Sequence, residues 1–257
     1  MITKSYMNNI IKLIFEQGLS EQFRGMTIGI AAIVTTIFSI WYGTKLKISK
    51  KKIILFLLIA YPIDYLLLEI SMLITQYAMR NHLFGIQTVV NSQSKTFVVL
   101  PLVAFLAAKI IKVMPKVIAD ILAVANLLNY AICSLGCLFT GCCIGYPSSR
   151  GIYAPTTEKN AFPIQVVNAA IMVSITIYLV YRSKKLGYEA DGKQFPWMFI
   201  LFGSTRFVTE FFMDNEKVFL GCSVVALHAL FMLSVGIVIL VVTCRRTNKR
   251  LKEEAVL

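Results

Sequence analysis

Residues 136–147, GCLFTGCCIGYP, end a long apolar run with a concentration of Gly, Cys, Tyr and Pro. Backbone that stops being helical at a membrane surface must be buried in protein or line a cavity, because hydrocarbon offers it no hydrogen-bonding partner. The glycines at 136, 141 and 145 permit either close approach of the backbone to a ligand or tight helix packing. The segment is therefore a candidate site for handling a substrate.

Arg206 and Glu210 form a second polar feature inside an apolar run. They are four residues apart, so on a helix they share a face and can pair. Charged side chains within a membrane span are costly, which makes the pair a functional-site hypothesis; an ion pair that only holds helices together is the alternative. The planar fork of an arginine suits a phosphate. A phospholipid head group is the phosphate expected at this depth.

Cys137, Cys142 and Cys143 could in principle bind a metal or form a disulfide, for which Cys222 is a possible partner. The spacing is not that of an ordinary zinc site. Buried thiols are the favoured interpretation, and no metal is predicted. His82 and His228 are expected to be packed or solvated, and His82 is the better catalytic candidate of the two. Asp120 is expected near a helix start.

The chain that must position these groups has 257 residues, 57% of them hydrophobic, and a net charge of +13. Most basic residues lie in short loops between apolar runs, which indicates a membrane surface and not nucleic acid as the partner. Runs of about 20 apolar residues are long enough to span a bilayer. We predict an all-α, polytopic membrane protein with seven transmembrane helices, at about 25–43, 53–77, 97–111, 117–140, 163–181, 196–213 and 219–243.

The loops predict orientation, because one alternate set carries most of the Lys and Arg. The positive-inside rule then places the N-terminus outside and the C-terminus in the cytoplasm. Residues 1–24 are expected to be an interfacial amphipathic arm, since apolar residues recur there at helical spacing. Residues 25–244 form the transmembrane domain and residues 245–257 a basic cytoplasmic tail. In this topology residues 93–96, residues 136–147, Gln165 and the Arg206–Glu210 pair all lie at the outer face.

Four segments resemble one known family. They are SKTFVVLPLVAFLAAKI (94–110), GCLFTGCCIGYPSS (136–149), FPIQVVNA (162–169) and LFGSTRFVTEFFMD (201–214). In order and spacing they are similar to motifs of the prolipoprotein diacylglyceryl transferases, seven-span bacterial membrane enzymes, and especially of their clostridial-type relatives. The resemblance implies transfer of a diacylglyceryl group from phosphatidylglycerol to the lipobox cysteine thiol of preprolipoproteins. The expected location is the plasma membrane, with the site facing the outer leaflet, and no cofactor is expected.

The resemblance also implies roles for individual residues. Arg206 and Glu210 match the catalytic positions, and Gly145 matches the glycine after the signature core. The residues expected to bind substrate are Lys95, Gly136, Gly141, Gly145, Gln165 and Arg24.

The chain also departs from the family pattern. Ser134 replaces an arginine, Cys137 an asparagine, and Met213 the final arginine of the EFFR form, while residues 93–96 lack the family histidine. Lys95 and Arg24 could supply positive charge to a phosphate instead. A related enzyme with a different acceptor, or a lipid-binding or transport protein without chemistry, therefore remain as alternatives. The apolar inner half and the lack of an inverted repeat disfavour transport.

Overall fold

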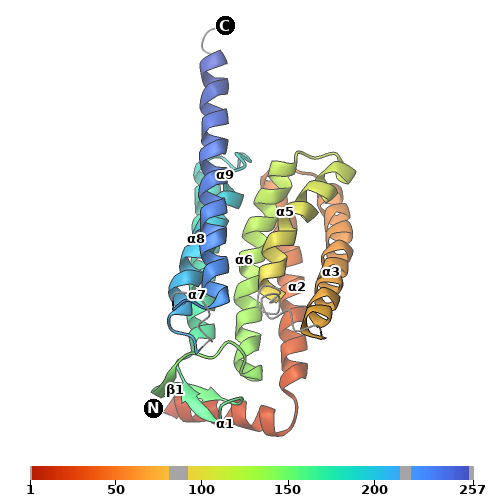
Figure 1. Cartoon of the computed structure of the whole chain (residues 1–257). Helices are drawn as coiled ribbons and strands as arrows, with labels where there is room; N and C mark the ends of the chain where they lie inside the picture. The colour runs from red at the N-terminus through yellow and green to blue at the C-terminus, as the bar shows by residue number, and fades with distance from the viewer. Residues whose placement is uncertain (1, 81–91, 215–220, 255–257) are drawn as a thin grey trace.

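The computed structural model of the chain describes residues 2–80, 92–214 and 221–254, most of which are helical (Figure 1). The helices are α1 (Ile2–Glu16), α2 (Ser20–Lys45), α3 (Lys50–Arg80), α5 (Ser92–Ile111), α6 (Pro115–Thr140), α7 (Ile164–Lys185), α8 (Gln194–Glu210) and α9 (Val224–Glu254). Two short strands, β1 (Pro147–Ala154) and β2 (Lys159–Ala161), form an antiparallel hairpin between α6 and α7. The helical class predicted from the sequence is confirmed, and the hairpin is an addition to it.

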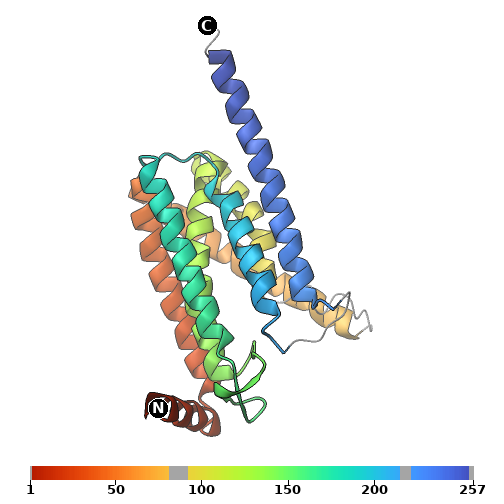
Figure 2. The same ribbon diagram turned by 90° about the vertical axis from the view of Figure 1, so that its left-hand side faces the viewer.

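The long helices run side by side, while α1 lies across one end of the bundle, next to β1 (Figures 1 and 2). We call this the hairpin end; it is where α2 begins, α6 ends and α7 begins. At the opposite end, the tail end, α9 projects beyond the other helices (Figure 1). The backbone N–H of Tyr153 donates a hydrogen bond of 2.9 Å to Asn8 Oδ1, which ties α1 to the hairpin.

Four helices among the described residues are long and apolar enough to cross a membrane. They are α2, α6, α7 and residues Val225–Arg246 of α9, and they coincide with four of the predicted spans. The other three predicted spans are also helical, as α3, α5 and α8. The number of spans and the sidedness of the termini remain predictions. Part of the predicted tail is helical, because α9 continues to Glu254.

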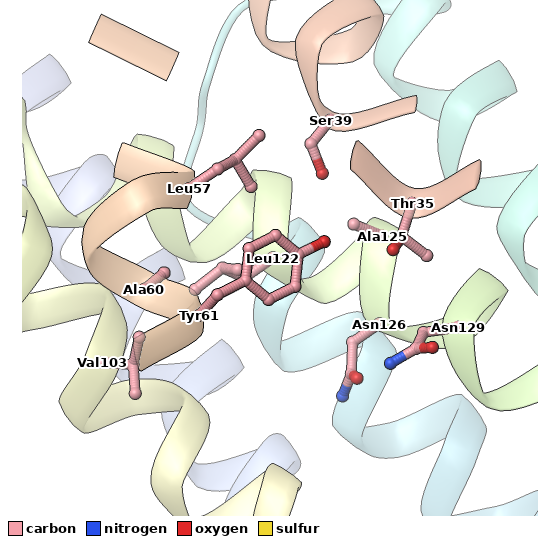
Figure 3. A pocket seen from close by; sticks show the side chains of 10 residues that line it. All are labelled: Thr35, Ser39, Leu57, Ala60, Tyr61, Val103, Leu122, Ala125, Asn126 and Asn129. Carbon is pink, nitrogen blue, oxygen red and sulfur yellow. The ribbon is translucent and has the colours of Figure 1, made fainter. Parts of the chain in front are cut away.

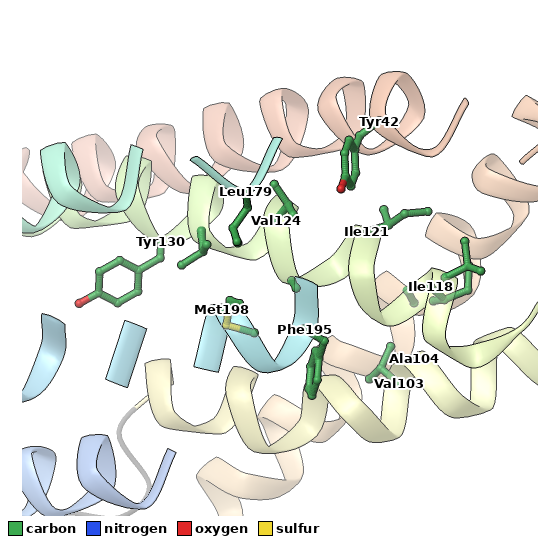
Figure 4. Close-up of a cluster of buried hydrophobic side chains, with 14 of the residues drawn as sticks. Tyr42, Val103, Ala104, Ile118, Ile121, Val124, Tyr130, Leu179, Phe195 and Met198 are labelled. Atoms are coloured by element: carbon green, nitrogen blue, oxygen red, sulfur yellow. The ribbon is translucent and has the colours of Figure 1, made fainter. Parts of the chain in front are cut away.

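The core surrounds α6, which packs against α2, α5, α7 and α8. Tyr42, Ile121, Leu179 and Met198, from α2, α6, α7 and α8, have no exposed surface (Figure 4). Apolar side chains of this kind fill the space between the helices. The helix pair α8–α9 is packed especially closely, since a Cβ added at Gly203 would lie 2.7 Å from the carbonyl oxygen of Ala229.

Asp120 fixes the tail end of the bundle. Its carboxylate is buried and accepts hydrogen bonds from the backbone N–H groups of Gly192 at 3.0 Å and Phe195 at 3.2 Å. Asp120 lies near the start of α6, as the sequence predicts, but its carboxylate binds the start of α8. Nearby, Arg182 Nη2 pairs with Asp191 Oδ2 at 2.9 Å. These contacts set the position from which α8 runs toward the hairpin end.

Candidate functional site

The segment between α6 and β1 is held between two distant parts of the chain. The N–H of Asp214 donates to the carbonyl of Ile144 at 3.0 Å, and the N–H of Tyr146 donates to the carbonyl of Phe212 at 3.1 Å. On the other side the N–H of Phe162 donates to the carbonyl of Tyr146 at 2.9 Å. Three of the four segments singled out in the sequence therefore meet at the hairpin end.

The glycines explain how the chain turns there. Gly141 ends α6 with φ 68°, a left-handed conformation that glycine adopts without a steric penalty. A Cβ at Gly145 would overlap the carbonyl oxygen of Phe162, and one at Gly136 would overlap the Thr27 hydroxyl of α2. Gly136 thus allows α6 to pack closely against α2, and Gly145 allows the backbone to pass close to Phe162. Tight packing was one of the two interpretations of the sequence. Contact of these glycines with a ligand stays a prediction.

Arg206 and Glu210 lie on the inward face of the last turns of α8. Both are 6% exposed, and Arg206 Nη2 is 3.4 Å from Glu210 Oε2, so the predicted pairing is confirmed. Arg206 Nη1 also donates to the sulfur of Met213 at 3.2 Å. Glu210 Oε1 accepts a hydrogen bond of 2.6 Å from the hydroxyl of Ser223, just before α9. The Glu210 carboxylate is therefore oriented by Ser223, the residue directly before α9.

The Arg206 guanidinium faces α6 as well as Glu210. It interacts electrostatically with the Tyr130 hydroxyl and with the thiols of Cys143 and Cys137. Tyr130 is buried, and its ring packs edge-on against Phe202 with centroids 5.0 Å apart. A guanidinium, a phenol and thiols thus share one largely buried site at the hairpin end. Such a group of donors can stabilise an anion, because burial reduces competition from water.

Three thiols form the most compact cluster of this site. The sulfur atoms of Cys137, Cys142 and Cys143 all lie within 4.8 Å of one another, and all three residues are free cysteines. The Thr140 hydroxyl donates to Cys142 Sγ at 3.2 Å. Hydrogen bonds from the Cys137 and Cys143 thiols, with that from Thr140, lower the pKa of Cys142 because they stabilise its thiolate. The sequence predicted buried thiols but not this cluster.

The remaining predicted binding residues fall in three different settings. Gln165 is buried, and its Nε2 donates to the carbonyl of Cys142 at 2.9 Å, so it supports the turn that carries the thiols. Arg24, at the start of α2, is 3.6 Å from Glu21 and interacts electrostatically with Cys142. Lys95 lies in the first turns of α5, and its side chain is outside the described residues. His82 is outside them altogether.

One cavity adjoins this arrangement, and another lies farther along α6. One, of about 110 Å³, lies between residues 144–147 and the hairpin and is lined by the polar side chains of Thr157, Lys159, Asn160 and Asp214. The other, of about 80 Å³, lies deeper in the bundle between α2, α3, α5 and α6 (Figure 3). Its wall is mainly apolar, with the amides of Asn126 and Asn129 among its polar groups (Figure 3).

Sequence reasoning did not single out Tyr130, Ser223 or Lys159. Ser223 carried a recognisable signal, since a serine directly before an apolar run is a common helix cap, and its hydroxyl accepts from the N–H of Ala226 at 3.1 Å. Tyr130 looked like any aromatic residue in an apolar span. Lys159 carried no signal, because nothing in its sequence neighbours predicts the hairpin that presents it.

The comparison with known families agrees with this geometry. The family model of the prolipoprotein diacylglyceryl transferases matches residues 13–242, a stretch that includes residues 136–149, 162–169 and 201–214, which meet at the hairpin end. No curated protein matches the chain. The matched stretch covers most of the sequence. The chain therefore belongs to the prolipoprotein diacylglyceryl transferase family.

Proposed function

We propose that this protein transfers the diacylglyceryl group of phosphatidylglycerol to the lipobox cysteine of a preprolipoprotein. Its family consists of membrane transferases of lipoprotein biosynthesis. The observation that carries the proposal is the buried Arg206–Glu210 pair, 3.4 Å apart, beside the thiol cluster where the family segments meet. A buried guanidinium at the mouth of an apolar bundle suits a substrate that has both a phosphate and acyl chains.

The chemistry requires a thiolate and a stabilised leaving group. The acceptor sulfur gives up its proton and forms a bond to the terminal glyceryl carbon of the donor, while that carbon's bond to the phosphate oxygen breaks. The released glycerol phosphate keeps the electron pair of the broken bond. Arg206 is proposed to stabilise the charge that grows on the phosphate. Glu210, held by Ser223 at 2.6 Å, orients the guanidinium.

The surroundings fit such a substrate. The polar cavity of about 110 Å³ next to Gly145 contains Lys159 and is a suitable place for the glycerol of the head group. The mainly apolar cavity of about 80 Å³, nearer the tail end along α6, suits part of an acyl chain. The distribution of basic loops supports an orientation in which the hairpin end faces the outer leaflet. Lys95 and Arg24 are proposed as further contacts with the phosphate.

The test uses the full chain in phosphatidylglycerol vesicles with a lipobox peptide. We expect the peptide to gain the mass of a diacylglyceryl group and glycerol phosphate to be released in equal amount. Arg206→Ala should abolish both the mass gain and the release. Arg206→Lys should recover little of this activity, because the lysine ammonium is a point charge and lacks the planar set of donors of the guanidinium. Arg182→Ala removes a comparable Arg–Asp pair at the tail end and serves as the matched control. Full activity of Arg206→Ala would refute the assignment.

A second candidate is the same transfer to a different acceptor. Ser134 favours it, because this residue, where the family has an arginine, is buried and donates to the carbonyl of Tyr130 at 2.8 Å, so it brings no charge to the site. Consumption of phosphatidylglycerol without any mass gain on the peptide would support this candidate. A small-thiol acceptor added to the same vesicles would then be the next substrate to try.

A further inference from the structure

The thiol cluster is built by a specific turn of the chain. Cys137 lies in the last turn of α6, and Gly141, with φ 68°, turns the backbone so that Cys142 and Cys143 come back beside it. Cys143 itself has φ 56°, a left-handed conformation that non-glycine residues adopt rarely. The turn is braced by the hydrogen bond from Gln165 to the Cys142 carbonyl. The three sulfurs are thus gathered by the fold.

The separation of the sulfurs fits a thiophilic cation. In a tetrahedral zinc site with Zn–S bonds of about 2.3 Å, neighbouring sulfurs are about 3.8 Å apart. All three sulfur atoms here lie within 4.8 Å of one another. The cluster is therefore only slightly wider than the sulfur spacing of such a site allows. Three cysteines leave one position of the tetrahedron open, which is the pattern of catalytic zinc sites and not of closed structural ones.

The charges around the cluster fit the same ion. Three thiolates and Zn²⁺ carry a net charge of −1, and Arg206 and Arg24 both interact electrostatically with these cysteines. Among the described residues, the Tyr130 hydroxyl also interacts electrostatically with Cys143 and Cys137, and Glu210 pairs with Arg206. Thr140 donates to Cys142 Sγ at 3.2 Å, a hydrogen bond of the kind that orients metal ligands. The two arginines therefore offset the net negative charge that the three thiolate ligands and the ion would carry together.

We propose that Cys137, Cys142 and Cys143 bind a Zn²⁺ ion whose open position takes the acceptor thiol. The part about the acceptor rests on the proposed function. Coordination removes the thiol proton to water and keeps the sulfur as a nucleophilic thiolate. That thiolate then forms the C–S bond to the glyceryl carbon, as the C–O bond to phosphate breaks and glycerol phosphate leaves. The ion so provides the activation that a base would otherwise give.

The first test is metal content. The full chain, purified in detergent without chelators, should contain about one zinc per chain, and Cys137→Ser, Cys142→Ser and Cys143→Ser should each lose most of it. Cys133→Ser is the matched control, because Cys133 lies on the same helix and its thiol bonds Asn129 instead of joining the cluster. Size-exclusion profiles and melting temperatures identify any variant that fails to fold. Absence of metal, copper in place of zinc, or a disulfide among the three cysteines would each overturn the proposal.

The second test separates the ion from the reaction. Zinc replaced by Co²⁺ should give a thiolate-to-cobalt absorption band in the wild type and in Cys133→Ser, and not in the cluster variants. A lipobox peptide should shift that band, whereas the same peptide with serine for cysteine should not. A cobalt band that no thiol peptide shifts would overturn the open-position role. A shift of the band without diacylglyceryl transfer would refute the proposed function and support the zinc site. Transfer by metal-free protein would support the proposed function and overturn the role of the ion.

Discussion

The hydroxyl of Ser223 donates a hydrogen bond of 2.6 Å to Glu210 Oε1 and at the same time accepts one of 3.1 Å from the N–H of Ala226. One side chain thus caps the start of α9 and holds the carboxylate that pairs with Arg206. Farther along the same two helices, α8 and α9 also pack closely at Gly203. The orientation of the buried arginine therefore depends on the start of the last helix.

Ser223→Ala should lower kcat/KM for diacylglyceryl transfer by about tenfold, because a hydrogen bond to a charged group contributes about 1.5–3 kcal/mol and part of it is re-formed with water. Ser223→Thr keeps the hydroxyl and should retain most of the activity. The measurement is initial rate against phosphatidylglycerol concentration for both variants. Equal loss in the alanine and threonine variants would mean that packing, and not the hydrogen bond, matters at this position.

Tyr130→Phe removes only the hydroxyl that interacts with Arg206 and leaves the edge-on contact with Phe202 in place. We expect kcat/KM to fall about three- to tenfold with little change in melting temperature, since the phenol helps to fix the guanidinium but fills no space by its oxygen. The two readouts are the transfer rate and thermal unfolding in the same detergent. A drop in stability with unchanged activity would contradict the assignment.

Much of the fold could be predicted because apolar runs of membrane length have few alternatives to helix. The pairing of Arg206 with Glu210 followed from their spacing of four residues, since helical periodicity places both on one face. The same local rule failed for the thiols. Cys137 and Cys142 come together only because Gly141 leaves the helical conformation, and Cys143 adopts a φ that its side chain does not favour.

The hairpin was also beyond local reasoning. Its strands, PSSRGIYA and KNA, are short and lack the alternating apolar pattern that predicts a half-buried strand. The pairing is supported by a distant helix, through the contact of Asn8 with Tyr153. Lys159 therefore becomes a site residue only in three dimensions. Lys95 stays a prediction made from the sequence.

Gly145→Ala should destabilise the hairpin end, because the added methyl group would overlap the carbonyl oxygen of Phe162 and force apart the segment that carries the thiols. We expect a loss of about 1–3 kcal/mol in the free energy of unfolding and a larger relative loss of activity. Gly29→Ala, in α2, is the control, since nothing lies within 4 Å of its added Cβ. Thermal unfolding of both variants provides the check. If both unfold like the wild type, the turn is looser than the contact with Phe162 implies.

Asp120→Ala should destabilise the protein without impairing the chemistry. The variant leaves the N–H groups of Gly192 and Phe195 without their buried acceptor at the tail end, far along α6 from Arg206. Loss of hydrogen bonds to a buried carboxylate costs about 2–4 kcal/mol, so the melting temperature should fall clearly. Asp120→Asn keeps one oxygen acceptor and should lie between the alanine variant and the wild type. Below its melting temperature the alanine variant should retain a wild-type kcat/KM, because the helix that carries Arg206 is anchored at its other end by Ser223 and by Asp214. A fall in kcat/KM of the folded variant, matched by a weaker response of the Co²⁺ band to lipobox peptide, would show instead that the start of α8 sets the position of the arginine.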